Sequence, residues 1–427
     1  MVETIKNAWS IPELRKKILF TILMIVIFRI GSVIPVPYID PVAMNAFMEA
    51  TGGTIFGFLD TLTGGAFASA TIFALSITPY INASIIMQLL TVAIPALERL
   101  AKEGVEGRKK LAKYTRYLTV LIGLLMGFAY YMVLRNQFNA VLYPHNVFVA
   151  FVIILTFTAG TAFIMWLGEQ ITEYGIGNGI SIILFAGIIS RGPAMVKSVM
   201  AMNESGQLNV LTTIILIIVA VLIVAFVVFM TNAERRIPVQ YAKRVVGRKM
   251  YGGQSTHIPL KVNMSGVLPI IFASSIVSLP ELIARFLPAP EVGSFGYLVL
   301  NLISSSSWLY AIIYFLLIIF FNFFYVSIQF NPIEVANNLK KNGGFVPGIR
   351  PGKPTSEYIS KILSKVIVIG AIFLGLIAVL PIFFSRALGM NLYFGGTSLL
   401  IVVGVALDTV KQMESQMLMR HYKGFLE

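Results

Sequence analysis

The chain has 427 residues, of which 57% are hydrophobic and only 12% are charged. Soluble domains carry about 25% charged residues, so this composition excludes an ordinary soluble protein and predicts a polytopic membrane protein. The absence of cysteine excludes disulfide bonds, thiolate metal sites and cysteine nucleophiles. A net charge of +14 predicts contact with acidic partners or with anionic lipid headgroups.

Ten apolar stretches are candidates for membrane-spanning helices, which need roughly 20 residues each. In chain order they cover residues 18–35, 66–94, 117–134, 147–167, 176–189, 210–230, 264–283, 308–330, 366–384 and 392–410. The fifth and the tenth are short for a full span. We therefore predict an all-α membrane protein with ten transmembrane helices.

A short apolar segment precedes the second candidate and lies between two glycine pairs, at 52–53 and 64–65. It has about ten residues and is too short to cross a bilayer. We predict a short re-entrant helix hinged by glycines, followed by a spanning helix over 66–94 that is broken at Pro79 beside a cavity. A loop followed by a plain packed helix is an equally open alternative.

Most of the 33 Lys and Arg residues lie in the N-terminal segment, in the loops after the second, sixth and eighth candidates, and in the C-terminal tail. The positive-inside rule places these segments, and hence both termini, in the cytoplasm. Arg29 lies inside the first candidate, near its outer end. We expect its side chain to reach the membrane interface rather than to serve a function.

Ten helices divide into two halves of five, at about residues 1–200 and 201–427, and an odd number per half inverts the second half. The second and seventh helices each carry an internal proline, Pro79 and Pro269, and the fifth and tenth are both short. We infer a central path lined by these four helices. The alternative is that their small polar residues only permit close helix packing.

The centres of these four helices carry branched apolar side chains instead of charges. They are Ile77, Ile81, Ile180, Leu184, Leu268, Ile271 and Ile401. An apolar constriction can exclude water, but it offers no specific site for a small solute. It favours a conduit for large and chemically varied cargo, although core packing explains any single isoleucine equally well.

Motifs of enzymes and metal sites are missing from the sequence. The three histidines, His145, His257 and His421, are not paired at helical spacing, and there is no GxSxG motif. Residues 348–355 resemble a phosphate-binding loop only weakly, because the glycine spacing is wrong. We predict no catalytic residue, no metal site and no cofactor.

Two basic cytoplasmic loops, at about 231–262 and 331–365, are predicted to be too structured to serve as simple tethers. The second begins with a predicted helix at Pro332 and continues into a Pro/Gly turn that presents Arg350. Arginine suits bidentate contact with carboxylate or phosphate groups. Two such loops on one face favour a docking platform over merely solvated loops.

Several long motifs run from end to end of the chain. They are FRIGS at 28–32, SITPYINASIIMQLL at 76–90, EGRKKLAKYTRY at 106–117, MWLGEQITEYGIGNGISII at 165–183, QSTHIPLKVNMSGVLP at 254–269, NPIEVANNLKKNGGFVPGIRPGKPT at 331–355 and FGGTSLLIVVGVALDT at 394–409. These stretches resemble the bacterial SecY family, the pore subunits of the Sec protein translocase. The resemblance implies an hourglass channel in the bacterial plasma membrane that passes unfolded secretory polypeptides and releases membrane segments sideways into lipid.

The resemblance also implies roles for individual residues. It places a pore ring at Ile77, Ile81, Leu184, Ile271 and Ile401, where Leu184 replaces the isoleucine common in such rings. It places a plug at residues 55–66, including Ile55, Phe56, Phe58, Leu59, Leu62, Gly64 and Gly65. It places a lateral gate at Asn82 and Leu279, and a docking surface at Arg350 with Lys243, Arg244 and Arg248.

The implied partners are SecE, SecG, the SecA ATPase, the ribosome, signal peptides and unfolded substrates. Two other functions share parts of this pattern. A secondary transporter has the same inverted-repeat logic, but it needs polar groups at the midplane, where this sequence is aliphatic. A scaffold without a conduit would show no flux of any cargo in vesicles.

Overall fold

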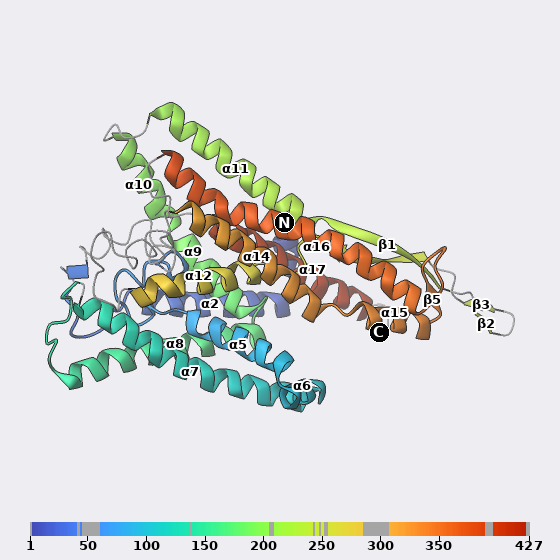
Figure 1. Cartoon of the computed structure of the whole chain (residues 1–427), viewed down its shortest axis with the longest axis horizontal. Coiled ribbons are helices and arrows are strands. Elements are labelled where there is room, and N and C mark those ends of the chain that lie inside the picture. Colours follow the sequence, from blue (N-terminus) through green and yellow to red (C-terminus); the bar gives the residue numbers. More distant parts are fainter. Residues whose placement is uncertain are drawn as a thin grey trace. The chain divides into compact units, whose positions relative to one another are not determined.

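The computed structural model describes residues 2–40, 43–44, 60–136, 138–204, 209–241, 244–246, 249–251, 255–284, 307–388 and 396–423. Helices make up most of these residues (Figure 1). The chain forms two compact units, Met1–Ile217 with Phe384–Glu427, and Ile218–Phe383.

The described part of the first unit consists of helices, turns and two isolated β-bridges, Pro35 with Thr71 and Ile39 with Val141. Its helices are α1 (Val2–Ser10), α2 (Pro12–Gly31), α5 (Thr78–Ala93), α6 (Pro95–Lys102), α7 (Val105–Asn136), α8 (Val147–Tyr174), α9 (Gly179–Ser190), α10 (Gly192–Glu204) and α17 (Gly396–Lys423). Helix α8 packs against α2, α7 and α9, while α5 packs against α7 and α17 packs against α9. An apolar core between α7 and α8 includes Tyr130, Leu134, Ile153 and Phe157.

The second unit combines helices with two small sheets. Its helices are α12 (Leu268–Ala284), α14 (Trp308–Gln329), α15 (Pro332–Lys341) and most of α16 (Lys353–Leu388), and α11 (Val210–Asn232) runs into it from the first unit. One antiparallel sheet has the order β4-β1-β5, formed by β4 (Ser255–Lys261), β1 (Glu234–Tyr241) and β5 (Gly344–Phe345). A second sheet pairs β2 (Arg244–Val246) with β3 (Lys249–Tyr251). These strands were not predicted.

Each of the ten predicted spans overlaps one helix, namely α2, α5, α7, α8, α9, α11, α12, α14, α16 and α17. Within the described residues, six helices are long and apolar enough to cross a membrane, and α5 with α6, bent by 102°, would be a seventh. Helix α11 is apolar and largely exposed, as expected of a surface that faces lipid. The fold is that of a polytopic helical membrane protein, and the count of ten spans stays a prediction.

The predicted helix over residues 66–94 is wrong in its first part. Residues 64–77 form a series of turns, and α5 begins only at Thr78, with Pro79 in its first turn. Helix α12 likewise begins at Leu268, next to Pro269. Proline suits a first turn because the N–H groups there have no partner within the helix. The two prolines therefore start helices instead of interrupting them.

Candidate functional site

Ile77 and Ile81 lie at the start of α5, where the series of turns becomes a helix. Ile77 is completely buried and precedes the helix, and the Ile81 N–H donates to its carbonyl oxygen at 3.0 Å. A Cβ atom on Gly168 of α8 would lie 3.5 Å from the Cδ1 atoms of Ile77 and Ile183. Ile77, which precedes α5, and Ile183 of α9 thus lie next to the same glycine.

Leu184 and Ile401 belong to the same unit as Ile77 and Ile81. Both are buried, on α9 and α17, and these two helices pack together. Ile271 is half-buried on α12, in the second unit. A ring of all five residues therefore stays a prediction. The same holds for the lateral gate, because half-buried Asn82 is on α5 in the first unit and Leu279 is on α12 in the second, with its side chain outside the description.

The predicted plug is described only at its C-terminal end. Ile55, Phe56, Phe58 and Leu59 lie outside the described residues, whereas residues 60–63 are helical and Leu62 is buried. Gly64 and Gly65 follow with φ values of +69° and +96°. The Gly65 N–H donates to the Asp60 carbonyl at 3.0 Å and the Gly64 N–H donates to the Thr61 carbonyl at 3.3 Å, the paired bonds of a Schellman helix end.

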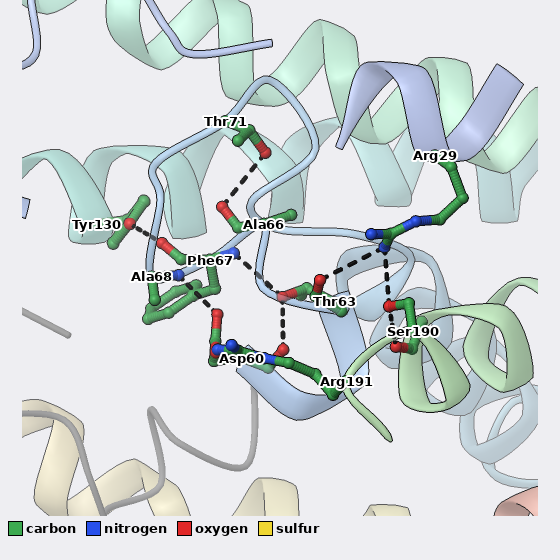
Figure 2. A network of polar contacts seen from close by, with 12 residues as sticks. Arg29, Asp60, Thr63, Ala66, Phe67, Ala68, Thr71, Tyr130, Ser190 and Arg191 are labelled. Atoms are coloured by element: carbon green, nitrogen blue, oxygen red, sulfur yellow. Dashed lines mark hydrogen bonds and ion pairs between the residues drawn. The ribbon is translucent and has the colours of Figure 1, made fainter. Parts of the chain in front are cut away.

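The turns that follow Gly65 are mostly buried, with Ser69 exposed, and side chains bond several of their backbone groups (Figure 2). The Ala68 N–H donates to the Asp60 carboxylate at 2.7 Å, and the Phe67 N–H donates to Thr63 Oγ1 at 3.1 Å. The Tyr130 hydroxyl of α7 donates to the Phe67 carbonyl. Irregular backbone at membrane depth is stable only where protein surrounds it in this way.

Two arginines reach the same turn from different helices (Figure 2). Arg191, at the break between α9 and α10, forms an ion pair with Asp60. Arg29 of α2 donates through Nη1 to Ser190 Oγ at 2.9 Å and, more weakly, to the Gly64 carbonyl at 3.4 Å. Arg29 therefore contacts groups within the protein, and the expectation that its side chain reaches the membrane interface stays a prediction.

Asp60 and Arg191 are functional candidates that the sequence reasoning missed. A signal was present, because Asp60 is the only acidic residue in the apolar segment 54–63, and a lone carboxylate at membrane depth needs a partner. Arg191 lies two residues after the fifth predicted span. Nothing in the sequence, however, pairs two residues that are more than a hundred positions apart. Within the described residues, no group of three or more His, Asp or Glu side chains could hold a metal ion.

The two basic loops form a single structure instead of two separate ones. Strand β5 of the second loop pairs with β1 of the first loop, with Phe345 opposite Gln240 and Gly344 opposite Tyr241. A shared apolar core lies beneath the sheet, made of Ile237, Val239, Leu260, Leu339, Val346 and Ile359. We call this sheet with α15 and the turn at 346–352 the basic platform.

Arg350 lies in a stiff turn of the basic platform and is exposed. Pro347 and Pro351 restrict the backbone on either side. The Thr355 hydroxyl donates to the Arg350 carbonyl at 2.8 Å, which holds the turn against the start of α16. Arg244 lies in β2 with its side chain outside the description, and Lys243 and Arg248 lie outside the described residues altogether.

The basic platform also carries paired charges. Glu234 contacts Arg236 at 2.7 Å. The hydrogen bond from Arg236 lowers the pKa of the Glu234 carboxyl. Exposed Lys340 and Lys341 follow at the end of α15.

Comparison with known proteins decides the family. A family model described as SecY matches residues 71–410. The chain belongs to the SecY family. A SecY relative from Streptomyces scabiei, named protein translocase subunit SecY, is 47% identical over 440 residues that cover all of both chains. A SecY relative of the same name from Thermotoga maritima is 45% identical over 434 residues, covering 100% of this chain and 98% of the relative.

Solved structures show the same fold. A structure described as a protein conducting channel is similar with a TM-score of 0.65 at 21% identity, covering 94% of this chain and 92% of that chain. A SecY structure whose description concerns its plug domain is similar with a TM-score of 0.66 at 20% identity and the same coverage. The channel of a canine ribosome-channel complex is similar with a TM-score of 0.61 at 19% identity. This SecY family member is thus a multi-pass membrane protein with the channel fold.

Proposed function

We propose that this chain is the pore subunit of a protein-conducting channel in the bacterial plasma membrane. It passes unfolded secretory polypeptides and releases membrane segments sideways between α5 and α12, at Asn82 and Leu279. The observation that carries the proposal is full-length similarity to translocase subunits at 47% identity. It is supported by the buried, non-helical segment that joins a short helix to Ile77.

The proposed constriction consists of Ile77, Ile81, Leu184, Ile271 and Ile401. The burial of Ile77, Ile81, Leu184 and Ile401 within one unit supports this assignment for these four residues, and Ile77 lies next to Gly168. A dry aliphatic ring seals against ions and lets varied side chains pass, because it makes no hydrogen bonds with them. Residues 55–66 form the proposed plug, and both termini lie in the cytoplasm by the distribution of basic residues.

The basic platform is the proposed docking surface for the SecA motor or the ribosome, through Arg350 with Arg244, Lys243 and Arg248. Exposed Arg350, Lys340 and Lys341 beside a sheet with its own apolar core support this role, since carboxylates and phosphates are the complementary partners. SecE and SecG are the proposed membrane partners. Signal peptides are the proposed ligands that open the channel. Anionic lipids are proposed to contact the basic residues that follow α5.

Site-specific cross-linking tests the proposed function. A secretory chain is stalled during motor-driven transport, and a photoreactive side chain is placed at Ile81, with an exposed position on α11, Ile217, as the matched control. We expect a cross-link to the stalled chain from position 81 and none from position 217. Equal yields at both positions, or none at position 81, would contradict the proposed path.

A further inference from the structure

We propose that Arg29 and Arg191 form a clamp that holds the end of the plug helix in the closed channel and sets how strong a signal must be to open it. The inference rests on the proposed function, in which residues 55–66 are the plug. It concerns the four-residue turn around Gly64, where the two cations arrive from α2 and from the α9–α10 break (Figure 2).

The ion pair between Asp60 and Arg191 is poorly accessible to water. The side chain of Asp60 is 6% exposed and that of Arg191 is 29% exposed. A buried carboxylate that loses its cation remains as an uncompensated charge, so breaking such a pair is strongly unfavourable. Arg191 is therefore required to keep Asp60 charged and buried.

The second arginine acts on the backbone of the same turn. Arg29 bonds Ser190 at 2.9 Å and contacts the Gly64 carbonyl, and Ser190 Oγ donates in turn to the Gly187 carbonyl at 2.6 Å. A Cβ atom on Gly187 would lie 2.3 Å from the Leu62 carbonyl oxygen. The absence of a side chain on Gly187 lets the plug helix end rest directly on α9, and the arginines fasten it there.

Asp60 links the clamp to the segment that leads into α5. The same carboxylate that pairs with Arg191 accepts the Ala68 N–H at 2.7 Å. Residues 66–77 run without a helix from there to Ile77, so a shift of α5 pulls on Asp60 through this segment. We infer that a signal peptide that displaces α5 draws Asp60 away from Arg191 and releases the plug. Because the Asp60–Arg191 ion pair must break first, only a signal peptide that binds strongly enough releases the plug.

A double-mutant cycle tests the clamp. The variants are Asp60→Asn, Arg191→Gln and the two together, and Asn keeps an oxygen that can accept the Ala68 N–H. Each is combined with Leu62→Cys in purified channel reconstituted without motor, and the rate of thiol alkylation is measured. Leu62 is 7% exposed and the chain has no native cysteine, so the background is clean.

We expect Arg191→Gln to raise the alkylation rate at position 62 at least about tenfold, equivalent to about 1.4 kcal/mol. In the double variant the alkylation rate should lie between those of Arg191→Gln and the unmodified pair, because no unpaired buried charge remains. Arg116→Gln is the matched control, since it breaks the more exposed Arg116–Glu169 pair of the same unit, and it should leave the rate unchanged. Unchanged alkylation in Arg191→Gln, or a rise of the same size in Arg116→Gln, would overturn the clamp.

The threshold is tested by transport of a precursor with a weakened signal sequence. We expect Arg191→Gln to transport this precursor better than the unmodified chain does, and both to transport an intact precursor. A faster alkylation without improved transport of the weakened precursor would overturn the threshold. Failure of the unmodified chain to transport even the intact precursor would contradict the proposed function instead, so the two failures are distinguishable. If Arg191→Gln does not fold, the neutral double variant against Asp60→Asn gives the same comparison.

Discussion

Single apolar side chains at the start of α5 and in α17 carry the proposed seal. We expect Ile81→Asn or Ile401→Asn to increase ion leak through the resting channel, since a buried amide without a partner costs about 1–3 kcal/mol and favours entry of water. Conductance in a planar bilayer measures the leak. Ile81→Leu keeps the site apolar and should stay tight. An Asn variant as tight as the unmodified channel would remove its residue from the ring.

Arg350 is the residue on which the docking proposal depends most. We expect Arg350→Glu to abolish motor-driven translocation while expression and folding remain normal, because the side chain is exposed and outside the core of the platform. Truncating one member of a desolvated charge pair costs about 2–5 kcal/mol. Arg350→Lys should be partly active, since an ammonium group cannot form the bidentate contact.

Lys340 and Lys341 provide the control for Arg350. They are exposed on α15 in the same basic platform. Neutralising either one should reduce translocation only mildly in the reconstituted assay. Normal translocation by Arg350→Glu would mean that the turn is only a connection between α15 and α16.

At the scale of elements, the end of the plug helix requires glycine at position 64. Its φ is +69°, and a Cβ atom there would lie 2.4 Å from Ser190 Oγ and 2.8 Å from the Gly187 carbonyl oxygen. The left-handed conformation alone costs about 1–2 kcal/mol for other residues. We expect Gly64→Ala to lower the Tm of the purified channel clearly, whereas Gly192→Ala, which has open space around it, should leave the Tm nearly unchanged. If Gly64→Ala has the same Tm as the unmodified channel, the turn accommodates a side chain at position 64 and does not require glycine.

Positions of helices were predictable from the sequence, and the segment between 64 and 77 was not. Long apolar runs specify helices such as α8 and α14 because the membrane admits few alternatives. Residues 66–77 are just as apolar, but their irregular backbone depends on distant partners such as Tyr130 and Asp60. Local composition does not reveal these contacts, so a helix broken only at Pro79 was predicted over 66–94, with a loop before it as the open alternative.

Parts of the candidate site were predictable where a residue and its immediate neighbours in the sequence indicate its role. Branched apolar residues at the centre of a span, and an arginine between two prolines, can be recognised locally. The pairing of Asp60 with Arg191, and of β1 with β5, joins segments far apart in the sequence and is set by tertiary packing. Strands β1 and β4 were not predicted because the many charges of the first loop mask the alternation of buried and exposed residues, such as Ile237 and Val239 in β1.

At the scale of the whole molecule, the contacts divide the chain differently from the predicted halves. Helix α17 belongs to the same unit as α1 and α9, against which it packs, although it lies in the second half of the sequence. The inverted arrangement of residues 1–200 and 201–427 stays a prediction, since it concerns symmetry and not contact. The matching start of α5 and α12 at a proline is consistent with it.

A covalent tie across the clamp tests whether the plug must leave α9 for transport. We expect the double variant Asp60→Cys with Arg191→Cys, joined by a short cleavable bis-maleimide, to block translocation, and cleavage of the linker to restore it. Either single variant treated with the same reagent is the control. Full transport with the linker verified in place would mean that polypeptide passes without movement at this turn.

The strand shared by the two loops has a mechanical consequence. Strand β5 precedes α16 and follows α15 and α14, whereas β1 and β4 directly connect α11 to α12. If a motor docks at the Arg350 turn as proposed, the pairing of β1 with β5 would spread its thrust over the ends of α11, α12, α15 and α16 instead of bending one loop. The hydrogen bonds between β1 and β5 would then couple the two loops mechanically and give the proposed motor a stiff surface to push against.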